Sequence, residues 1–149
     1  MTKVHAVPAG YGTVTPFLNV KGASEALEFY KKAFGAEERA RLTGPNGTIM
    51  HGEMKIGTSI VMIGEAMMNA PTTTSLHIFV EDCDALWARA TGAGCKVEMP
   101  LADQFWGDRY GVLSDKFGNR WSIASRKEEL SSEEMQKRGV AAMAAMMKK

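Results

Sequence analysis

Residues 105–124 read FWGDRYGVLSDKFGNRWSIA, and this stretch has the pattern of a β-hairpin. Two runs typical of strands, 110–114 and 120–124, flank the turn sequence Asp115–Asn119. Gly118 lies inside that turn, where a residue with positive φ is needed and glycine adopts it without steric cost. We therefore expect the chain to complete its last sheet here.

The same stretch is rich in side chains that recognise ligands. Trp106, Arg109 and Tyr110 follow one another closely at the start of the hairpin. Arginine offers a planar fork to carboxylates and phosphates, and tryptophan and tyrosine offer flat apolar faces with one polar atom each. Aromatic packing between neighbouring strands explains these residues equally well, so both interpretations stay open at this point.

The composition is that of one compact domain. With 149 residues, 45% hydrophobic and 23% charged, the chain can bury a sizeable core. A net charge of +1 gives no basic surface, so we expect no nucleic-acid partner. No apolar run approaches the ~20 residues that span a bilayer, and two cysteines are too few for a disulfide framework. We expect a cytoplasmic protein with no membrane partner.

The first half of the chain predicts the order β-α-β-β-β. Ser24 can begin a helix that ends at Phe34, because apolar residues recur at helical spacing and Gly35 is a typical C-terminal stop. The strands around it alternate apolar and polar residues, with glycine-containing turns between them. The predicted strands are 13–20, 37–42, 48–55 and 58–63.

The second half repeats this order after a linker. A strand at 75–80 precedes a helix that Asp84 can cap and Gly94 can end, and strands at 96–99, 110–114 and 120–124 follow. Turn, cap and strand positions correspond at an offset of about 60 residues, which indicates an internal duplication. The predicted segments are an irregular leader (1–12), a first module (13–64), a linker (65–74), a second module (75–127) and a C-terminal tail (128–149).

The tail predicts one more helix. Ser131 and Glu134 have the spacing of a capping box, and a segment rich in alanine and methionine follows. An isolated helix of this length is marginally stable, so we expect its apolar side to pack on this chain or on a partner.

Two duplicated βαβββ modules resemble the vicinal oxygen chelate superfamily of glyoxalases, bleomycin resistance proteins and extradiol dioxygenases. The phrases ALEFYKKAFGA (26–36), VEDCDAL (80–86), FWGDRYG (105–111) and DKFGNRW (115–121) are similar to its PhnB-like branch. The resemblance implies an α+β fold in which two curled mixed sheets surround a cup-shaped pocket, here with an added C-terminal helix. It also implies a homodimer.

Metal-dependent members of this superfamily take one ligand from the first and one from the last strand of each module. By strand alignment the matching residues are Thr15, Met62, Ser75 and Ser122, none of which is a histidine or a carboxylate. Hydroxyl groups and a thioether do not supply the donors of an open catalytic site. We therefore expect no cofactor and no metal at the usual position.

Strand alternation suggests one alternative metal site. His51 and Glu53 share a face of their strand, and His77 faces the cup if Ser75 does. Two histidines and a carboxylate can form a facial triad for one divalent ion, which would support a metal-dependent lyase, isomerase or dioxygenase. A strand histidine that only makes a hydrogen bond is the more common case.

The preferred interpretation is a small-molecule-binding protein of the glyoxalase and bleomycin-resistance type without the usual metal site. Aromatic walls and a few placed polar groups can hold a ligand without chemistry. The predicted ligand-binding residues are Phe17, His51, Glu53, Met62, His77, Phe79, Trp106, Arg109, Tyr110 and Ser122.

Overall fold

The computed structural model describes residues 4–67 and 70–148 and contains two four-stranded sheets. Their strand orders are β1-β4-β3-β2 and β5-β8-β7-β6, so each sheet has one parallel pair and two antiparallel pairs. The elements are β1 (Phe17–Val20), α1 (Ala23–Phe34), β2 (Glu37–Thr43), β3 (Ile49–Ile56), β4 (Ser59–Glu65), β5 (Ser75–Phe79), α2 (Cys83–Ala93), β6 (Lys96–Asp103), β7 (Asp108–Ser114), β8 (Arg120–Arg126) and α3 (Ser132–Met147), with a 3-10 turn at Pro45–Gly47. The predicted duplication of a βαβββ unit is confirmed.

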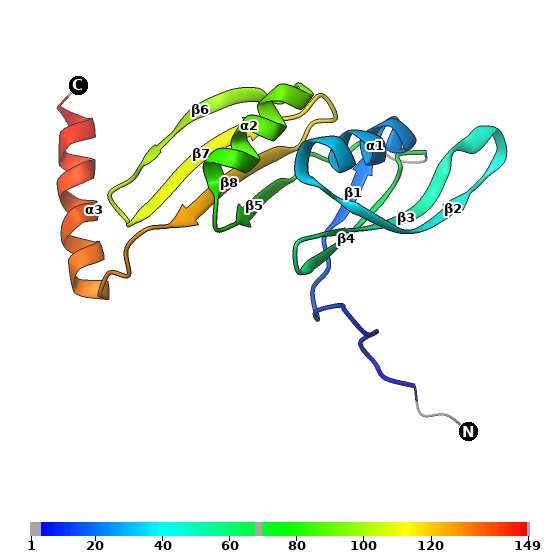
Figure 1. Cartoon of the computed structure of the whole chain (residues 1–149), viewed down its shortest axis with the longest axis horizontal. Coiled ribbons are helices and arrows are strands. Elements are labelled where there is room, and N and C mark those ends of the chain that lie inside the picture. Colours follow the sequence, from blue (N-terminus) through cyan, green and yellow to red (C-terminus); the bar gives the residue numbers. More distant parts are fainter. Residues whose placement is uncertain (1–3, 68–69, 149) are drawn as a thin grey trace.

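The two sheets lie side by side along the long axis of the molecule, with α1 and α2 against each other in the middle and α3 at the far end (Figure 1). They are separate sheets with no shared strand pairing. The predicted α+β class with an added C-terminal helix is therefore confirmed, but the two sheets of one chain do not close around a common cup. Their faces opposite the helices both remain open.

The helices begin at different residues from those predicted, and the reason is tertiary. The Glu65 carboxylate, at the end of β4, accepts hydrogen bonds from the backbone N–H groups of Gly22 (2.8 Å) and Ala23 (2.9 Å), so it takes the place of a Ser24 cap at α1. In α2 the cap is Asp82, whose side chain accepts from the Ala85 N–H at 3.1 Å, so Asp84 lies within the first turn. The Ser131 cap of α3 is confirmed.

The core joins the two modules. Trp121 of β8 is 1% exposed, and its ring centroid lies 4.5 Å from that of Phe34 and 5.3 Å from that of Tyr30, both on α1. Arg89 of α2 also donates to the backbone carbonyls of Lys31 and Lys32, which end α1. The C-terminal end of a helix carries partial negative charge on its last carbonyls, so a cation placed there is favourable.

A polar bridge reinforces this contact. The Tyr30 hydroxyl donates to the Asp115 carboxylate at 2.6 Å, and the Trp121 indole N–H donates to the same oxygen at 2.8 Å. The other oxygen of Asp115 accepts from the backbone N–H groups of Phe117 and Asn119. One carboxylate thus holds the predicted turn and ties it to α1.

The bridge predicts an alkaline weakness of the fold. Burial, and secondarily the Asp115 charge, raise the pKa of Tyr30 well above its usual value near 10. The folded protein therefore holds this proton more tightly, so the contribution is complete below pH 10 and declines by about 1 kcal/mol per pH unit above it. We expect urea unfolding to show a smaller loss of stability between pH 8 and pH 11 in Tyr30→Phe than in the native protein. An unchanged loss in this variant, with Tyr110→Phe as the control, would contradict the assignment.

Candidate functional site

The open face of the second sheet brings together five of the ten predicted ligand-binding residues. Register pairs His77 of β5 with Ser122 of β8, and the His77 Nδ1 lies 2.7 Å from the Ser122 Oγ. The His77 ring packs edge-on against Phe79 with centroids 4.3 Å apart, and it stacks on Tyr110 of β7 at 5.7 Å. Trp106 extends the group, with its ring 5.1 Å from Tyr110. We call His77, Phe79, Trp106, Tyr110 and Ser122 the aromatic cluster.

The aromatic cluster combines exposed apolar surface with one hydrogen-bonded polar pair, His77 and Ser122. Phe79 is 64% exposed, which is unusual for a side chain of this size, whereas Ser122 is 9% exposed. The Ser122 hydroxyl also lies 3.4 Å from the Leu76 carbonyl. When the hydroxyl donates to that carbonyl, Nδ1 of His77 is the donor to Ser122 and Nε2 is a free acceptor beside the rings.

Arg109 was predicted to bind ligand together with these residues, but it lies outside the aromatic cluster. Its guanidinium binds the Asp84 carboxylate through Nε and Nη2 at 3.0–3.2 Å, and it reaches Asp103 at 3.3 Å. The same contact lowers the pKa of Asp84, chiefly through its hydrogen bond with Arg109. Arg109 therefore already has two carboxylate partners, and its use as a free anion-binding side chain is not supported.

The remaining predicted residues lie on the open face of the first sheet. Phe17 of β1 is paired in register with Met62 of β4, and Met62 with Glu53 of β3. The Phe17 and His51 rings are 6.0 Å apart, and the His51 Nε2 lies 3.6 Å from a Glu53 oxygen. Nine of the ten predicted residues thus form two groups on two sheets, and Arg109 belongs to neither.

The leader lies against the first group. Residues 6–8, 11–13 and 15 share a hollow of about 340 Å³ with Glu53 and Met62. The Tyr11 hydroxyl is buried, and no group among the described residues forms a well-oriented hydrogen bond with it. The neighbouring Glu53 carboxylate is the main cause of a raised pKa of Tyr11. Residues 4–12 form no helix or strand, and several of them contribute to the wall around this face.

Strand register does not pair the four residues that were aligned with the superfamily's metal-ligand positions. The strand partners of Met62 and Ser122 are Phe17 and His77, whereas Thr15 precedes β1 and Ser75 is opposite Arg120. Only one of these four central side chains, His77, is a good metal donor, so the set does not fit a divalent ion.

The alternative triad of His51, Glu53 and His77 is not formed. His51 and Glu53 belong to the first sheet and His77 to the second. Within residues 4–67 and 70–148, no group of three or more histidine, cysteine, aspartate or glutamate side chains could hold a metal ion. Within the described residues of one chain, these three side chains therefore do not form a metal site.

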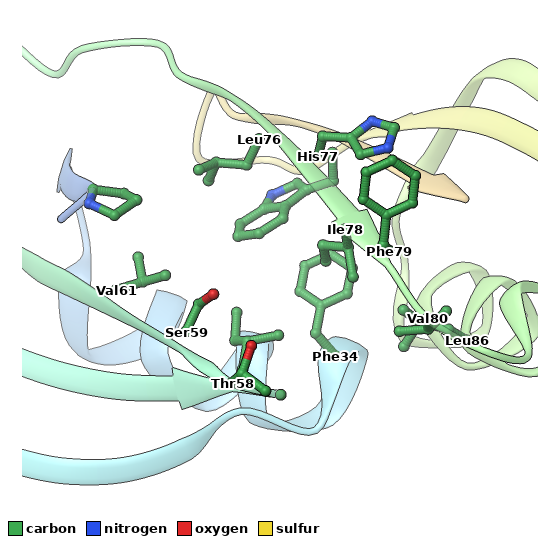
Figure 2. A pocket seen from close by; sticks show the side chains of 14 residues that line it. Phe34, Thr58, Ser59, Val61, Leu76, His77, Ile78, Phe79, Val80 and Leu86 are labelled. Carbon is green, nitrogen blue, oxygen red and sulfur yellow. The ribbon is translucent and has the colours of Figure 1, made fainter. Parts of the chain in front are cut away.

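An apolar groove separates the two modules. It has a volume of about 400 Å³ and lies between strand β5 and the β3–β4 hairpin. Figure 2 shows Leu76 and Ile78 directed into this groove, whereas the rings of His77 and Phe79 lie together on the other side of β5. Phe34 and Trp121 are among its lining residues. Sequence reasoning missed this groove because it depends on how the modules pack.

Comparisons with known proteins agree with this architecture. The model of the Glyoxalase/Bleomycin resistance protein/Dioxygenase superfamily matches residues 9–123. The uncharacterised protein Mb0911c of Mycobacterium bovis is 38% identical over 135 residues, covering 83% of this chain and 89% of its own. None of the helices in the described parts of the chain is long and apolar enough to cross a membrane.

Solved structures show the same fold. TioX from Micromonospora sp. ML1 superposes with a TM-score of 0.66 at 24% identity, covering 80% of this chain and all of its own. TnmS3, an antibiotic binding protein from Streptomyces sp. CB03234, gives 0.61 at 20% identity (78% and 98%), and the PhnB protein from Bacillus cereus gives 0.59 at 20% identity (76% and 99%). The chain therefore belongs to the glyoxalase, bleomycin resistance protein and dioxygenase superfamily.

Proposed function

We propose that this protein binds a small organic molecule with a flat apolar part, and that it does so without the usual metal site. The observation that carries the proposal is the aromatic cluster, in which exposed rings surround one fixed histidine–serine pair. Such a surface supplies both burial and orientation for a planar ligand. The antibiotic binding protein TnmS3, which shares this fold, supports the same class of function.

The proposal includes a homodimer in the cytoplasm. Neither open sheet face is covered by the other module of its own chain, and Phe17 (46% exposed) and Phe79 (64% exposed) lie one on each. Placing the first sheet of one copy over the second sheet of another would remove both from water. Light scattering should then give twice the chain mass of 16.2 kDa. A monomer at micromolar concentration would contradict the dimer.

Binding can be tested with neutral aromatic fragments, because the ligand is unidentified. We expect indole to shift the NMR signals of the His77 and Tyr110 rings, since a flat molecule can stack beside them. Phe79→Ala and Tyr110→Ala should each weaken this binding about three- to tenfold, as the loss of one aromatic contact implies. Val97→Ala is the control, because Val97 is partly exposed but is paired with core residue Leu113 on the opposite sheet face.

The result that would overturn the proposal is equally specific. Indole that shifts no signal of the aromatic cluster would contradict it. So would indole binding that weakens as much in the control variant as in Phe79→Ala.

A further inference from the structure

A polar hollow lies at the start of β5 and β8, beyond the aromatic cluster. It has a volume of about 340 Å³, and its lining residues are Thr73, Thr74, Ser75, Gly118 and Arg120. Three hydroxyl-bearing residues and one guanidinium thus surround a single open space. Hydroxyls and an arginine fork are the protein groups that bind the oxygens of carboxylates, phosphonates and phosphates.

The backbone holds this hollow in place. The Thr74 N–H donates to the side-chain oxygen of Asn119 at 3.1 Å, and the Arg120 N–H donates to the Thr74 carbonyl at 2.8 Å. Asn119 is fully buried and is bonded to Tyr30 and Asp115. The hydroxyl-bearing segment is therefore attached to the hydrogen-bonded turn that Asp115 and Asn119 hold, so a ligand would meet a site that is already ordered.

The Arg120 guanidinium is available for a ligand. In the described part of the chain it makes no side-chain hydrogen bond and no ion pair, whereas Arg41, Arg109 and Arg138 are each held by two carboxylates. The positive charge of Arg120 acts on the carboxylate of Glu98 on β6. Its pKa is lowered first by the Ser114 hydrogen bond (2.7 Å), then by Lys96, and less by Arg120. Glu98 is thus engaged by Ser114 and Lys96.

Strand register places the hollow beside the aromatic cluster. Ser75 is opposite Arg120, His77 opposite Ser122 and Phe79 opposite Ala124. Side chains two residues apart share a sheet face at roughly 7 Å spacing. The open face of the second sheet therefore carries, in order, a cation with hydroxyls, a histidine–serine pair and aromatic rings.

We propose that this hollow binds an oxyanion, and that the ligand of the second sheet is an aromatic oxyanion whose charged group lies at Arg120 and whose ring lies at the aromatic cluster. The proposal rests on the binding function proposed above and adds the chemical class of the ligand. Arg120 provides charge and a planar pair of donors, and the hydroxyls of Thr73, Thr74 and Ser75 complete the oxygen contacts.

Three probes separate the two parts of the site in NMR titrations of the full chain. Inorganic phosphate should shift the amide signals of Ser75 and Gly118 alone. Benzyl alcohol should shift the His77 ring alone, and phenylphosphonate should shift both sets and bind more tightly than either. Arg120→Gln should weaken phenylphosphonate binding about tenfold and leave benzyl alcohol unchanged, as the loss of a charge-assisted contact implies.

A matched control lies on the same strand. Arg126 is exposed on the same face as Arg120 but at the other end of β8, so Arg126→Gln should leave all three affinities unchanged. Arg120→Lys keeps the charge but loses the fork, so it should recover only part of the lost affinity.

The possible failures are distinguishable. Equal binding of phenylphosphonate and benzyl alcohol, unaffected by Arg120→Gln, would overturn the oxyanion site and leave the binding function intact. Phosphate binding that Arg120→Gln abolishes, with no His77 shift from either aromatic probe, would support the oxyanion site and overturn the binding function. If none of the probes produced a shift, both proposals would be overturned.

Discussion

Asp115→Ala is expected to lower the free energy of unfolding by about 3–5 kcal/mol, since it removes the acceptor of two largely buried side-chain donors at once. Tyr30 and Trp121 both donate to one Asp115 oxygen, and the turn amides of Phe117 and Asn119 donate to the other. None of these donors would regain a partner in the folded protein without moving the turn. The measurement is urea unfolding followed by circular dichroism.

Two further variants identify the cause of this loss. Asp115→Asn keeps the shape and one carbonyl oxygen, so it should lose less stability than the alanine variant. Asp108→Ala is the control, because the Asp108 carboxylate also accepts from a tryptophan, Trp106 at 3.0 Å, but accepts from no turn amide among the described residues. It should cost about 1 kcal/mol, the value of a single hydrogen bond. An equal loss at Asp108 and Asp115 would contradict the central role of the bridge.

Gly111→Ala is expected to destabilise the second module by about 2–4 kcal/mol through overpacking. A Cβ atom at Gly111 would lie 2.6 Å from the Trp87 ring and 2.9 Å from the Cα of Leu101. Both distances are shorter than a van der Waals contact. Because the second contact is with the backbone of Leu101, rotation of the Trp87 side chain alone would not relieve the overlap. The same unfolding experiment measures the effect.

Gly92→Ala is the matched control, because it adds the same methyl group to the same module. A Cβ atom at Gly92 would meet nothing within 4 Å, and the residue lies inside α2. Alanine is the better helix former, so this variant should be stabilised by about 0.5–1 kcal/mol. Trp87→Leu combined with Gly111→Ala should recover only part of the loss, because the contact with Leu101 remains. Full tolerance of Gly111→Ala would show that the close approach is not maintained in solution.

Local patterns predicted the fold because the features that define it are local. The helix stop at Gly35, the turn at Gly118 and the capping box at Ser131 act on neighbouring residues, and the second module repeats the first. Strand starts were less well predicted. β1 begins at Phe17 rather than Thr13, so Thr15 lies before the strand and Phe17 is the residue opposite Met62.

The site was only partly predictable, because side-chain partners come from distant parts of the chain. Alternation correctly placed His77 and Ser122 on one face, but the sequence contained no sign that Asp84, 25 residues away, would bind Arg109. Arg120 was expected on the same face as Ser122, yet only the positions of the charged side chains in residues 4–67 and 70–148 show that none of them pairs with it. The separation of His51 from His77 follows from sheets that do not close.

The interior shared by Phe34, Tyr30 and Trp121 has a consequence for the history of this duplicated chain. Each copy contributes what the other lacks: the first supplies the phenol and the aromatic wall, and the second supplies the carboxylate and the indole. A change on one side of this boundary must be accommodated on the other. The two repeats have thus become dependent on each other at their junction, where residues on the two sides can change only together.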